Sequence, residues 1–505
     1  MNIKKLSLII VIIVCITAAA VFVPKLINQN QNIETAIDAK TARLRANLGQ
    51  TFDGFAQNEA NALRKKILNS KNTDELYEVV GVKYYISAEG DDNNDGYTPE
   101  KPIKTLERLN QIYLCPGDAV LFKRGDVFRF GETVKLKSNV IYGCYGEGVK
   151  PRIYGSPENY AQNDKWETET ANVWKIPLTC DEACGLVINH SEIIGVKKID
   201  DVSALKQNGD YLHDTEKGVF YLYCDQGNLC EVYKDIEIMP STNILAAGVN
   251  KEKIVVDNLC IKYSSGFGIT STNTKNGFTV TNCEFGFLGG KWVNAQTKKL
   301  RYGNAVELWN GGKNVKIENN WFYQTYDSAL SWQGNLGADY INISFSGNLF
   351  EYNNGDIEFF DRNGAKLENF VMKDNIMRFT SMGWGTRKND GGIRGIEGCV
   401  RAVTGFRGKP ELAMDVRSVL FENNIIDCPA RQIINWNIEP EHLKNVKATG
   451  TKLYVKGSLR TLEPCLQGLQ QSANDKYDGR FAVGEKQLKE MFTRFEPKAE
   501  IYWED

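Results

Sequence analysis

Four acidic residues in the second half of the chain, Glu307, Glu358, Asp327 and Asp361, are the first candidates for chemistry. Two carboxyl groups can together cleave a glycosidic bond, because one protonates the leaving oxygen while the other activates a water molecule. A nearby carboxylate would raise the pKa of the protonated group. We therefore interpret these residues as candidate catalytic groups of a polysaccharide hydrolase. An exposed Glu on a strand can also serve only as a solubilising charge.

Aromatic, amide and basic residues accompany the acids. Trp309 lies two residues after Glu307, and Phe360 lies two residues after Glu358. Aromatic rings offer flat apolar faces on which pyranose rings can stack, while a few well-placed polar groups fix the orientation of a ligand. We expect a substrate-binding set that consists of Trp309, Gln333, Phe360, Arg362 and Lys388.

The basic residues support a second interpretation. The stretch from residue 387 to 407 carries Arg387, Lys388, Arg394, Arg401 and Arg407. Arginine binds carboxylates bidentately, so this stretch would suit a lyase or epimerase that acts on uronic-acid polymers. A third interpretation is a non-catalytic glycan-binding surface protein, because a fold can keep a binding face without chemistry. The residues leave all three open, and we favour hydrolysis.

The acids belong to a repeat of short apolar segments. Each segment has two apolar residues separated by one position, and a further apolar residue follows five positions later. The segments begin at Ile254, Phe278, Val315, Ile343, Phe370 and Val419, in steps of 24, 37, 28, 27 and 49 residues. Turn asparagines recur at Asn258, Asn282, Asn319, Asn320, Asn348, Asn375, Asn423 and Asn424. This pattern predicts a solenoid with hydrogen-bonded asparagine ladders and longer loops at 286–302 and 383–415.

A further strand in each coil carries the candidate site. Alignment of these strands places Ile269, Val306, Leu330 and Ile357 in one inward column. Side chains alternate along a strand, so the outward row must contain Thr270, Glu307, Ser331 and Glu358. The next outward row contains Thr272, Trp309, Gln333 and Phe360, and a sixth coil adds Asn435 and Asn437. Strands lie ~4.8 Å apart, so the two glutamates are expected at roughly 9–10 Å, near the long end of the ~6.5–9.5 Å range of inverting glycosidases.

Residues 83–155 resemble the start of a known fold family. The motifs are Tyr84-Tyr85-Ile86-Ser87, Asn94-Asp95-Gly96, Pro102-Ile103-Lys104-Thr105-Leu106, Pro116-Gly117-Asp118, Arg124-Gly125-Asp126 and Tyr145-Gly146-Glu147-Gly148. Together they resemble the N-terminal part of carbohydrate-active right-handed parallel β-helix proteins, the pectate-lyase-like superfamily. The resemblance covers the architecture from about residue 83 to 440. Lyases and hydrolases share this start, so it implies a fold and no particular reaction.

The other segments complete the expected organisation. Residues 1–27 form a signal peptide or signal-anchor helix, 28–80 a helical stalk or linker, 81–155 the start of the β-helix, 156–250 an irregular β insertion, 251–440 the coils with the site, and 441–505 a C-terminal cap. The expected fold class is therefore all-β, a right-handed parallel β-helix solenoid with an N-terminal membrane segment and a small C-terminal helical cap. An amphipathic helix at Lys486–Phe495 would hide the edge of the last coil.

The N-terminus is expected to direct the chain to a membrane. Two lysines precede an apolar run from Leu6 to Val23. These 18 residues, at ~1.5 Å per residue, are just long enough to cross ~30 Å of hydrocarbon. Three alanines at 18–20 offer a cleavage site, while the continuation of the run favours retention. We expect attachment to the cell membrane by this single helix with an extracellular body, or secretion after cleavage.

Composition and spacing argue against several other functions. The net charge of −2 gives nucleic-acid binding no electrostatic support, and only three histidines are present to build a metal site or a Ser-His triad. No cofactor is expected, although calcium stays open because Asp356 and Asp361 are close enough in sequence to share an ion. The loop at 91–96 imitates half of a calcium loop, but Pro102 replaces the required Glu, so an Asx turn is the better account.

Overall fold

The computed structural model describes residues 54–334, 337–361, 364–386, 398–404, 414–430, 432–437, 444–456 and 485–504. The apolar N-terminal run lies outside these ranges. Within them, no helix is both long enough and apolar enough to cross a membrane. Membrane attachment and export therefore stay predictions from the sequence.

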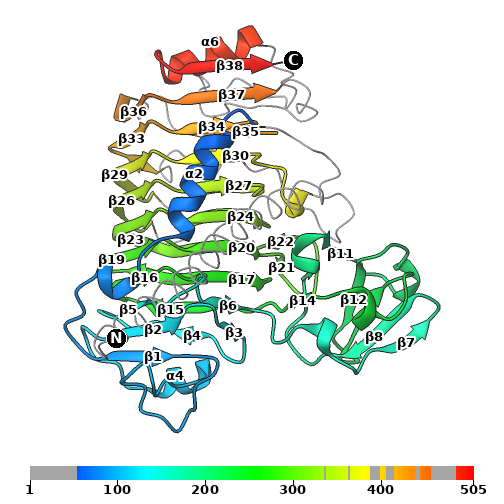
Figure 1. The fold of residues 1–505 in the computed structure, drawn as a ribbon. Helices are drawn as coiled ribbons and strands as arrows, with labels where there is room; N and C mark the ends of the chain where they lie inside the picture. Colours follow the sequence, from blue (N-terminus) through cyan, green and yellow to red (C-terminus); the bar gives the residue numbers. More distant parts are fainter. Residues whose placement is uncertain are drawn as a thin grey trace, which may run out of the picture.

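Short parallel strands stacked in three columns make up most of the structure (Figure 1). The first column contains β16 (Glu252–Asp257), β19 (Asn276–Thr281), β23 (Val306–Glu318), β26 (Tyr340–Ser346), β29 (Lys366–Lys373) and β33 (Val419–Glu422). The second contains β4 (Val134–Lys135), β15 (Leu245–Val249), β18 (Ile269–Thr274), the start of β23, β25 (Ser328–Gly334), β28 (Gly355–Asp361), β31 (Gly398–Thr404) and β35 (Gln432–Asn437). The third contains β3 (Val127–Arg129), β6 (Arg152–Tyr154), β17 (Cys260–Ser264), β20 (Glu284–Leu288), β24 (Trp321–Thr325), β27 (Leu349–Glu351), β30 (Ile376–Arg378), β34 (Ile425–Asp427), β37 (Lys452–Lys456) and β38 (Glu500–Glu504).

The three columns are the three faces of a parallel β-helix. Strand β23 spans a corner, because its first residues pair with β25 and its last residues pair with β26. In Figure 1 the strands of the third column face the viewer and point to the right while the chain climbs toward its C-terminal end, so the coil is right-handed. The predicted all-β architecture of parallel coils is confirmed.

Alternation of apolar and polar residues builds the core. Every second side chain of a strand points inward, and each coil stacks its apolar residues on the same positions of the next. Phe285, Phe322 and Phe350 stack in this way, with ring centroids 4.8 and 5.2 Å apart. The predicted inward column is confirmed, since its four members pair in register and are fully buried: Ile269, Val306, Leu330 and Ile357.

Buried asparagines join the coils at one corner. The backbone N–H of Asn320 donates to Oδ1 of Asn348 at 3.0 Å, and the same contact leads from Asn348 to Asn375 and from Asn375 to Asn424. Each side-chain amide also donates to a backbone carbonyl of the preceding coil. The residue before each ladder position has the left-handed backbone that Asn, Asp and Gly tolerate best: Asn319, Gly347, Asp374 and Asn423. The predicted ladder is confirmed.

Two segments that were expected to be long loops contain strands. Inside 383–415, residues 398–404 form β31, which pairs with β28 and completes the coil that β29 and β30 begin. Its apolar positions alternate as in the other coils, but residues 379–397 separate it from β30, so the spacing of the repeat did not reveal it. Inside 286–302, β21 (Lys291–Trp292) and β22 (Arg301–Tyr302) form an antiparallel hairpin.

Residues 156–241 leave the coils after β6 and form a small β unit, here called the insertion domain, whereas β15 of the predicted insertion 156–250 belongs to the second column. Its five-stranded sheet contains β11 (Val196–Lys197), β12 (Asp210–Asp214), β13 (Val219–Tyr223), β8 (Val173–Pro177) and β7 (Glu167–Thr170). A three-stranded sheet contains β10 (Ile193–Ile194), β9 (Gly185–Ile188) and β14 (Ile236–Met239). The two sheets share a core that is separate from that of the coils. The domain lies beside the β-helix in Figure 1, and the coil that follows it pairs directly with β6.

Helix α2 (Gln57–Leu68) lies across the third column in Figure 1. Its Arg64 is fully buried and forms a 2.6 Å ion pair with Glu351. The carboxylate of Asp427 accepts hydrogen bonds from the backbone N–H groups of residues 55 and 56, at the start of the helix. The described part of the expected stalk is therefore docked along the coils.

The C-terminal end of the β-helix carries a helix over the last coil. Helix α6 (Glu485–Phe495) buries Leu488 and Phe492 in the same core as the coils. The amphipathic helix predicted at Lys486–Phe495 is therefore confirmed. Because its apolar side closes the core, this helix shields the apolar end of the stack.

Candidate active site

The second column brings two of the predicted acids into one row. Thr270 pairs in register with Glu307, Glu307 with Ser331, and Ser331 with Glu358, as the alignment predicted. The two glutamates are thus two strand steps apart, which corresponds to about 10 Å between their backbones. Both side chains are buried, with 5% and 1% of their surface exposed, so they are not solubilising surface charges.

Glu307 is held in its protonated form. The pKa of its carboxyl group is raised from 4.5 to about 8, with burial as the largest cause and the charges of Glu358 and Asp327 as smaller ones. A hydrogen bond from Asn304 and the charge of Lys291 act in the opposite direction. The Asn304 amide donates to Oε2 at 2.6 Å, which fixes the carboxyl group in place. At neutral pH Glu307 therefore carries a proton that it can donate.

Glu358 accepts hydrogen bonds from its neighbours in the two outward rows. Its Oε2 accepts from the Ser331 hydroxyl at 3.0 Å and from the Gln333 amide at 3.2 Å. The Gln333 amide also donates to the Ser331 hydroxyl at 2.8 Å, which joins the three side chains into one cluster. This cluster orients an acceptor oxygen within the same row as the proton on Glu307.

Asp327 belongs to the same electrostatic cluster but lies deeper. It sits at the corner before β25 and is fully buried. Its charge contributes to the raised pKa of Glu307 and to that of Tyr302, where burial is the larger cause. Through this charge Asp327 influences the proton affinity of Glu307.

The predicted second row lies directly beside the acids. Trp309 pairs in register with Gln333, and Gln333 pairs with Phe360. All three are half-buried, so the two aromatic side chains flank an amide at the rim of the acid row. The backbone of Asp361 ends β28, opposite Gly334. The Asp361 side chain and the predicted binding residues Arg362 and Lys388 lie outside the part that the structure describes.

Strand β31 adds an arginine position to the acid row. Arg401 pairs in register with Glu358 on one side and with Asn435 on the other. The sequence predicts Arg401 in a basic loop beside the face, whereas the register places its position in the row itself. The predicted positions of Asn435 and Asn437 in a further coil are confirmed, since Asn437 pairs with Val403 of β31 in the second row.

The sequence patterns did not predict two residues that lower the pKa of Glu307, Lys291 and Asn304. Lys291 comes from the β21–β22 hairpin, and burial lowers its pKa while the charge of Glu307 opposes that effect. No repeat pattern marks this hairpin, so its approach to the row could not be foreseen. Asn304 did have a signal: it lies three residues before Glu307, as Asn353 lies three residues before Asp356 and donates to it at 3.1 Å.

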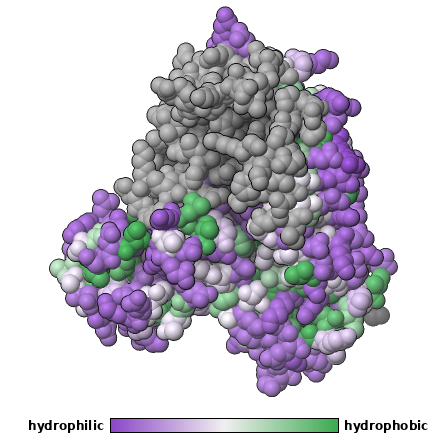
Figure 2. Space-filling model, turned by 180° about the vertical axis from the view of Figure 1, so that it is seen from behind, coloured by the Kyte–Doolittle hydropathy of each residue, from purple (hydrophilic) through white to green (hydrophobic). Residues whose placement is uncertain are grey.

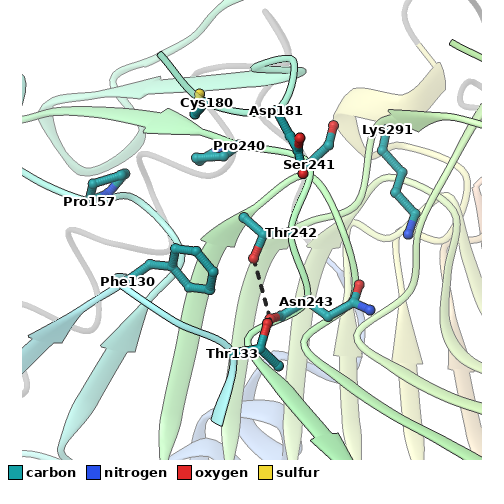
Figure 3. Close-up of a pocket in the computed structure, with 10 residues that line it drawn as sticks. All are labelled: Phe130, Thr133, Pro157, Cys180, Asp181, Pro240, Ser241, Thr242, Asn243 and Lys291. Atoms are coloured by element: carbon teal, nitrogen blue, oxygen red, sulfur yellow. Dashed lines mark hydrogen bonds between the residues drawn. The ribbon is translucent and has the colours of Figure 1, made fainter. Parts of the chain in front are cut away.

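A cleft of about 530 Å³ lies where the insertion domain meets the β-helix (Figure 3). Its walls are formed by Phe130, Thr133, Pro157, Cys180, Asp181, Pro240, Ser241, Thr242, Asn243 and Lys291. Lys291 lines this cleft and also acts on Glu307, so the cleft adjoins the acid row. Outside the grey atoms, the face in Figure 2 is mostly hydrophilic with small scattered hydrophobic groups.

Of the two residues considered for calcium, Asp356 is engaged within the fold, and the side chain of Asp361 lies outside the part that the structure describes. Asp356 is fully buried, and its two oxygens accept hydrogen bonds from Asn353 and Thr380. Calcium requires several oxygens that are free to coordinate it. In the described ranges, no three His, Cys, Asp or Glu side chains are grouped to hold a metal. At the other candidate loop, Asp91 accepts from the backbone N–H of Asn93 at 2.9 Å, which confirms the Asx turn.

No family model matches the chain, and no curated protein matches it. Among solved structures, a glycoside hydrolase is 10% identical over 76% of this chain and 94% of that one, with a TM-score of 0.42. A GH136 lacto-N-biosidase from Eubacterium ramulus is 13% identical over 85% of this chain and 69% of that one, with a TM-score of 0.34. A polygalacturonase from Erwinia carotovora ssp. carotovora is 12% identical over 79% and 97%, with a TM-score of 0.37. A rhamnogalacturonan lyase and a pectate lyase are also similar, so both hydrolases and lyases occur among these structures. At these levels the likeness assigns no activity, and function has to be argued from the site.

Proposed function

We propose that this chain is a glycoside hydrolase that cleaves a polysaccharide, with Glu307 as general acid and Glu358 as general base. The observation that carries the proposal is a buried, protonated Glu307 in the same row as a hydrogen-bonded Glu358. Two carboxyl groups in environments that differ in this way are suited to opposite roles in one reaction. Following the sequence prediction, we place the enzyme outside the cell.

The spacing of the two residues favours inversion of the anomeric carbon. In this mechanism Glu307 gives its proton to the glycosidic oxygen as the bond to the anomeric carbon breaks. Glu358 takes a proton from a water molecule, whose oxygen attacks that carbon from the opposite face. The backbones are about 10 Å apart, and side chains that extend side by side from these positions would keep the carboxyl groups beyond the ~5 Å that a covalent intermediate needs, which would leave room for the sugar and this water.

The half-buried residues of the second row complete the proposed site. The ring faces of Trp309 and Phe360 would bind the apolar faces of sugar rings on either side of Gln333. The amide of Gln333 is already bonded to Glu358, so a sugar hydroxyl that binds Gln333 would also adjust the orientation of the base. These contacts would hold the scissile bond between the two glutamates.

A lyase or epimerase acting on uronic-acid polymers is the second candidate. The observation in its favour is the register position of Arg401 next to Glu358, where a cation would neutralise a uronate carboxylate. The protonated state of Glu307 favours hydrolysis, because proton abstraction requires a base rather than an acid.

Digestion of a panel of neutral and acidic polysaccharides by the full-length chain tests the proposal. Hydrolysis produces reducing ends without new ultraviolet absorbance, whereas β-elimination produces an unsaturated uronate that absorbs. We expect reducing ends that disappear in Glu307→Gln and Glu358→Gln. Proton NMR of the first product should show the inverted anomer.

Glu318→Gln is the matched control, because Glu318 lies in the same strand as Glu307 and is half-buried on another face. This variant should keep full activity. New ultraviolet absorbance would reject the proposed hydrolysis and support the lyase. Glycan binding without any product would instead support a non-catalytic surface protein.

A further inference from the structure

The cleft beside the acid row contains an ammonium group without a partner anion. The Nζ atom of Lys291 lies 4.1 Å from the ring centroid of Phe267 and 5.1 Å from that of Tyr302. Among the residues placed by the structure, no carboxylate approaches this ammonium within 4.0 Å. A half-buried cation that is held only by ring faces gains stability when an anion binds beside it.

Other charges around the cleft are either paired or exposed. Glu182 forms ion pairs with Lys197 at 3.0 Å and with Lys298 at 3.4 Å, so it is already neutralised. Asp181 lines the cleft but is exposed to solvent, where its charge is screened. Among these charged groups, Lys291 is therefore the one whose charge a bound anion would neutralise.

The cleft lies at the same edge of the second column as the acid row. Lys135 pairs in register with Ala246, Ala246 with Thr270, and Thr270 with Glu307. The lining residue Thr133 comes directly before strand β4, and Asn243 comes two residues before strand β15. Strand steps of ~4.8 Å place Asn243 about 10 Å and Thr133 about 14 Å from the Glu307 level. An oligosaccharide that runs along the coil axis would reach both places.

The lining has the mixture of groups that sugars require. Phe130, Pro157 and Pro240 are apolar, while Thr133, Ser241 and Asn243 offer hydroxyl and amide groups. Figure 3 shows Phe130 and Lys291 on separate walls, with Thr242 and Asn243 between them. The volume of about 530 Å³ lies within the range of ~300–1,000 Å³ that is usual for small-molecule sites.

We propose that this cleft is a subsite for a sugar residue that carries an anionic group, a carboxylate or a sulfate, which pairs with Lys291. The inference rests on the proposed function in one respect, namely that the same saccharide chain extends to Glu307 and Glu358. The insertion domain then has a role, because it supplies part of the cleft wall through Pro157, Cys180 and Asp181. The enzyme would select chains with an acidic residue about two to three strand steps from the scissile bond.

Binding of single sugars to the full-length chain tests the subsite without any turnover. The probes are glucuronate, glucose 6-sulfate and glucose, each titrated by NMR into the wild type, Lys291→Met and Lys291→Arg. We expect at least one acidic sugar to bind tenfold or more tightly than glucose. Lys291→Met should abolish that preference and leave glucose binding unchanged, while Lys291→Arg should retain it.

The control variant is Lys299→Met, which removes an exposed lysine eight residues later and should bind like the wild type. Thermal unfolding of each variant shows that a loss of binding is not a loss of the fold. Preference for glucuronate alone identifies a carboxylate ligand, and preference for glucose 6-sulfate alone identifies a sulfated one. Equal binding of all three sugars, or unchanged acidic-sugar binding in Lys291→Met, overturns the inference.

The two proposals fail in different ways. Acid-selective binding without cleavage of any polysaccharide would remove the proposed hydrolysis and leave the subsite. Cleavage that depends on Glu307, combined with no preference for acidic sugars, would remove the subsite and leave the hydrolase.

Discussion

Replacing Glu307 by glutamine should stabilise the protein, and the gain should grow with pH. Glutamine resembles the protonated acid in size and keeps an oxygen that can accept the 2.6 Å hydrogen bond from Asn304. The wild-type side chain is ionised in the unfolded state above its ordinary pKa of 4.5, but it holds its proton in the fold up to about pH 8. Folding of the wild type therefore has to take up a proton at neutral pH, which the variant avoids.

The size of the effect follows from the two pKa values. A group whose pKa is raised in the folded state contributes its full stability below pH 4.5 and loses it as the pH rises through about 8. At about 1.4 kcal/mol for each pH unit, the loss is about 3 kcal/mol at pH 7 and about 5 kcal/mol above pH 9. Below pH 4.5 the wild type and the variant should have nearly equal free energies of unfolding.

Urea unfolding at several pH values from 4 to 9 measures this difference directly. Glu318→Gln, in the same strand, should show no growing difference from the wild type. If Glu307→Gln and the wild type keep the same difference at every pH, then Glu307 is ionised in the folded protein at neutral pH. It could not then serve as the general acid, and the reasoning from burial would be wrong.

Three further outcomes follow from single side chains. Asn304→Ala removes the donor that lowers the pKa of Glu307, so the alkaline limb of the pH–activity profile should move to higher pH. An unmoved limb would show that this hydrogen bond does not affect the proton affinity of Glu307 during the reaction. Arg64→Met leaves a buried carboxylate short of a partner and should lower the free energy of unfolding by about 3–5 kcal/mol in urea, whereas Lys65→Met on the exposed side of the helix should change it little. Asn348→Ala interrupts the buried ladder and should cost about 3 kcal/mol by the same assay, while Asn342→Gly in an exposed, left-handed position should cost about 0.5 kcal/mol or less.

The fold and the register of the site followed from local sequence patterns. Alternating apolar residues and a corner asparagine describe one coil, and each coil repeats this pattern. Aligning Val306 with Leu330 and Ile357 therefore placed Glu307 and Glu358 in one row. The structure reproduces that row pair by pair. Such patterns work because parallel coils stack like positions on like.

The environment of the row did not follow from those patterns. Burial of Glu307 and the approach of Lys291 depend on segments that cross the coils and do not repeat with them. Strand β31 was also missed, and with it the position of Arg401 beside Glu358. The sequence thus predicts which residues share a face, whereas the pKa of an acid on that face, such as Glu307, depends on contacts between distant segments.

Helix α2 has a consequence for the order in which the molecule is made. Its residues leave the ribosome early, yet Arg64 binds Glu351 287 positions later, and the N–H group of Ala56 binds Asp427 371 positions later. These two partners are therefore absent until most of the coils have been synthesised. A nascent chain interrupted before Glu351 would leave Arg64 of this helix without its buried carboxylate, even if its earlier coils had already stacked. Completion of these contacts thus requires synthesis past the coils of the candidate site, and the full-length chain differs from its truncated products in how helix α2 is held.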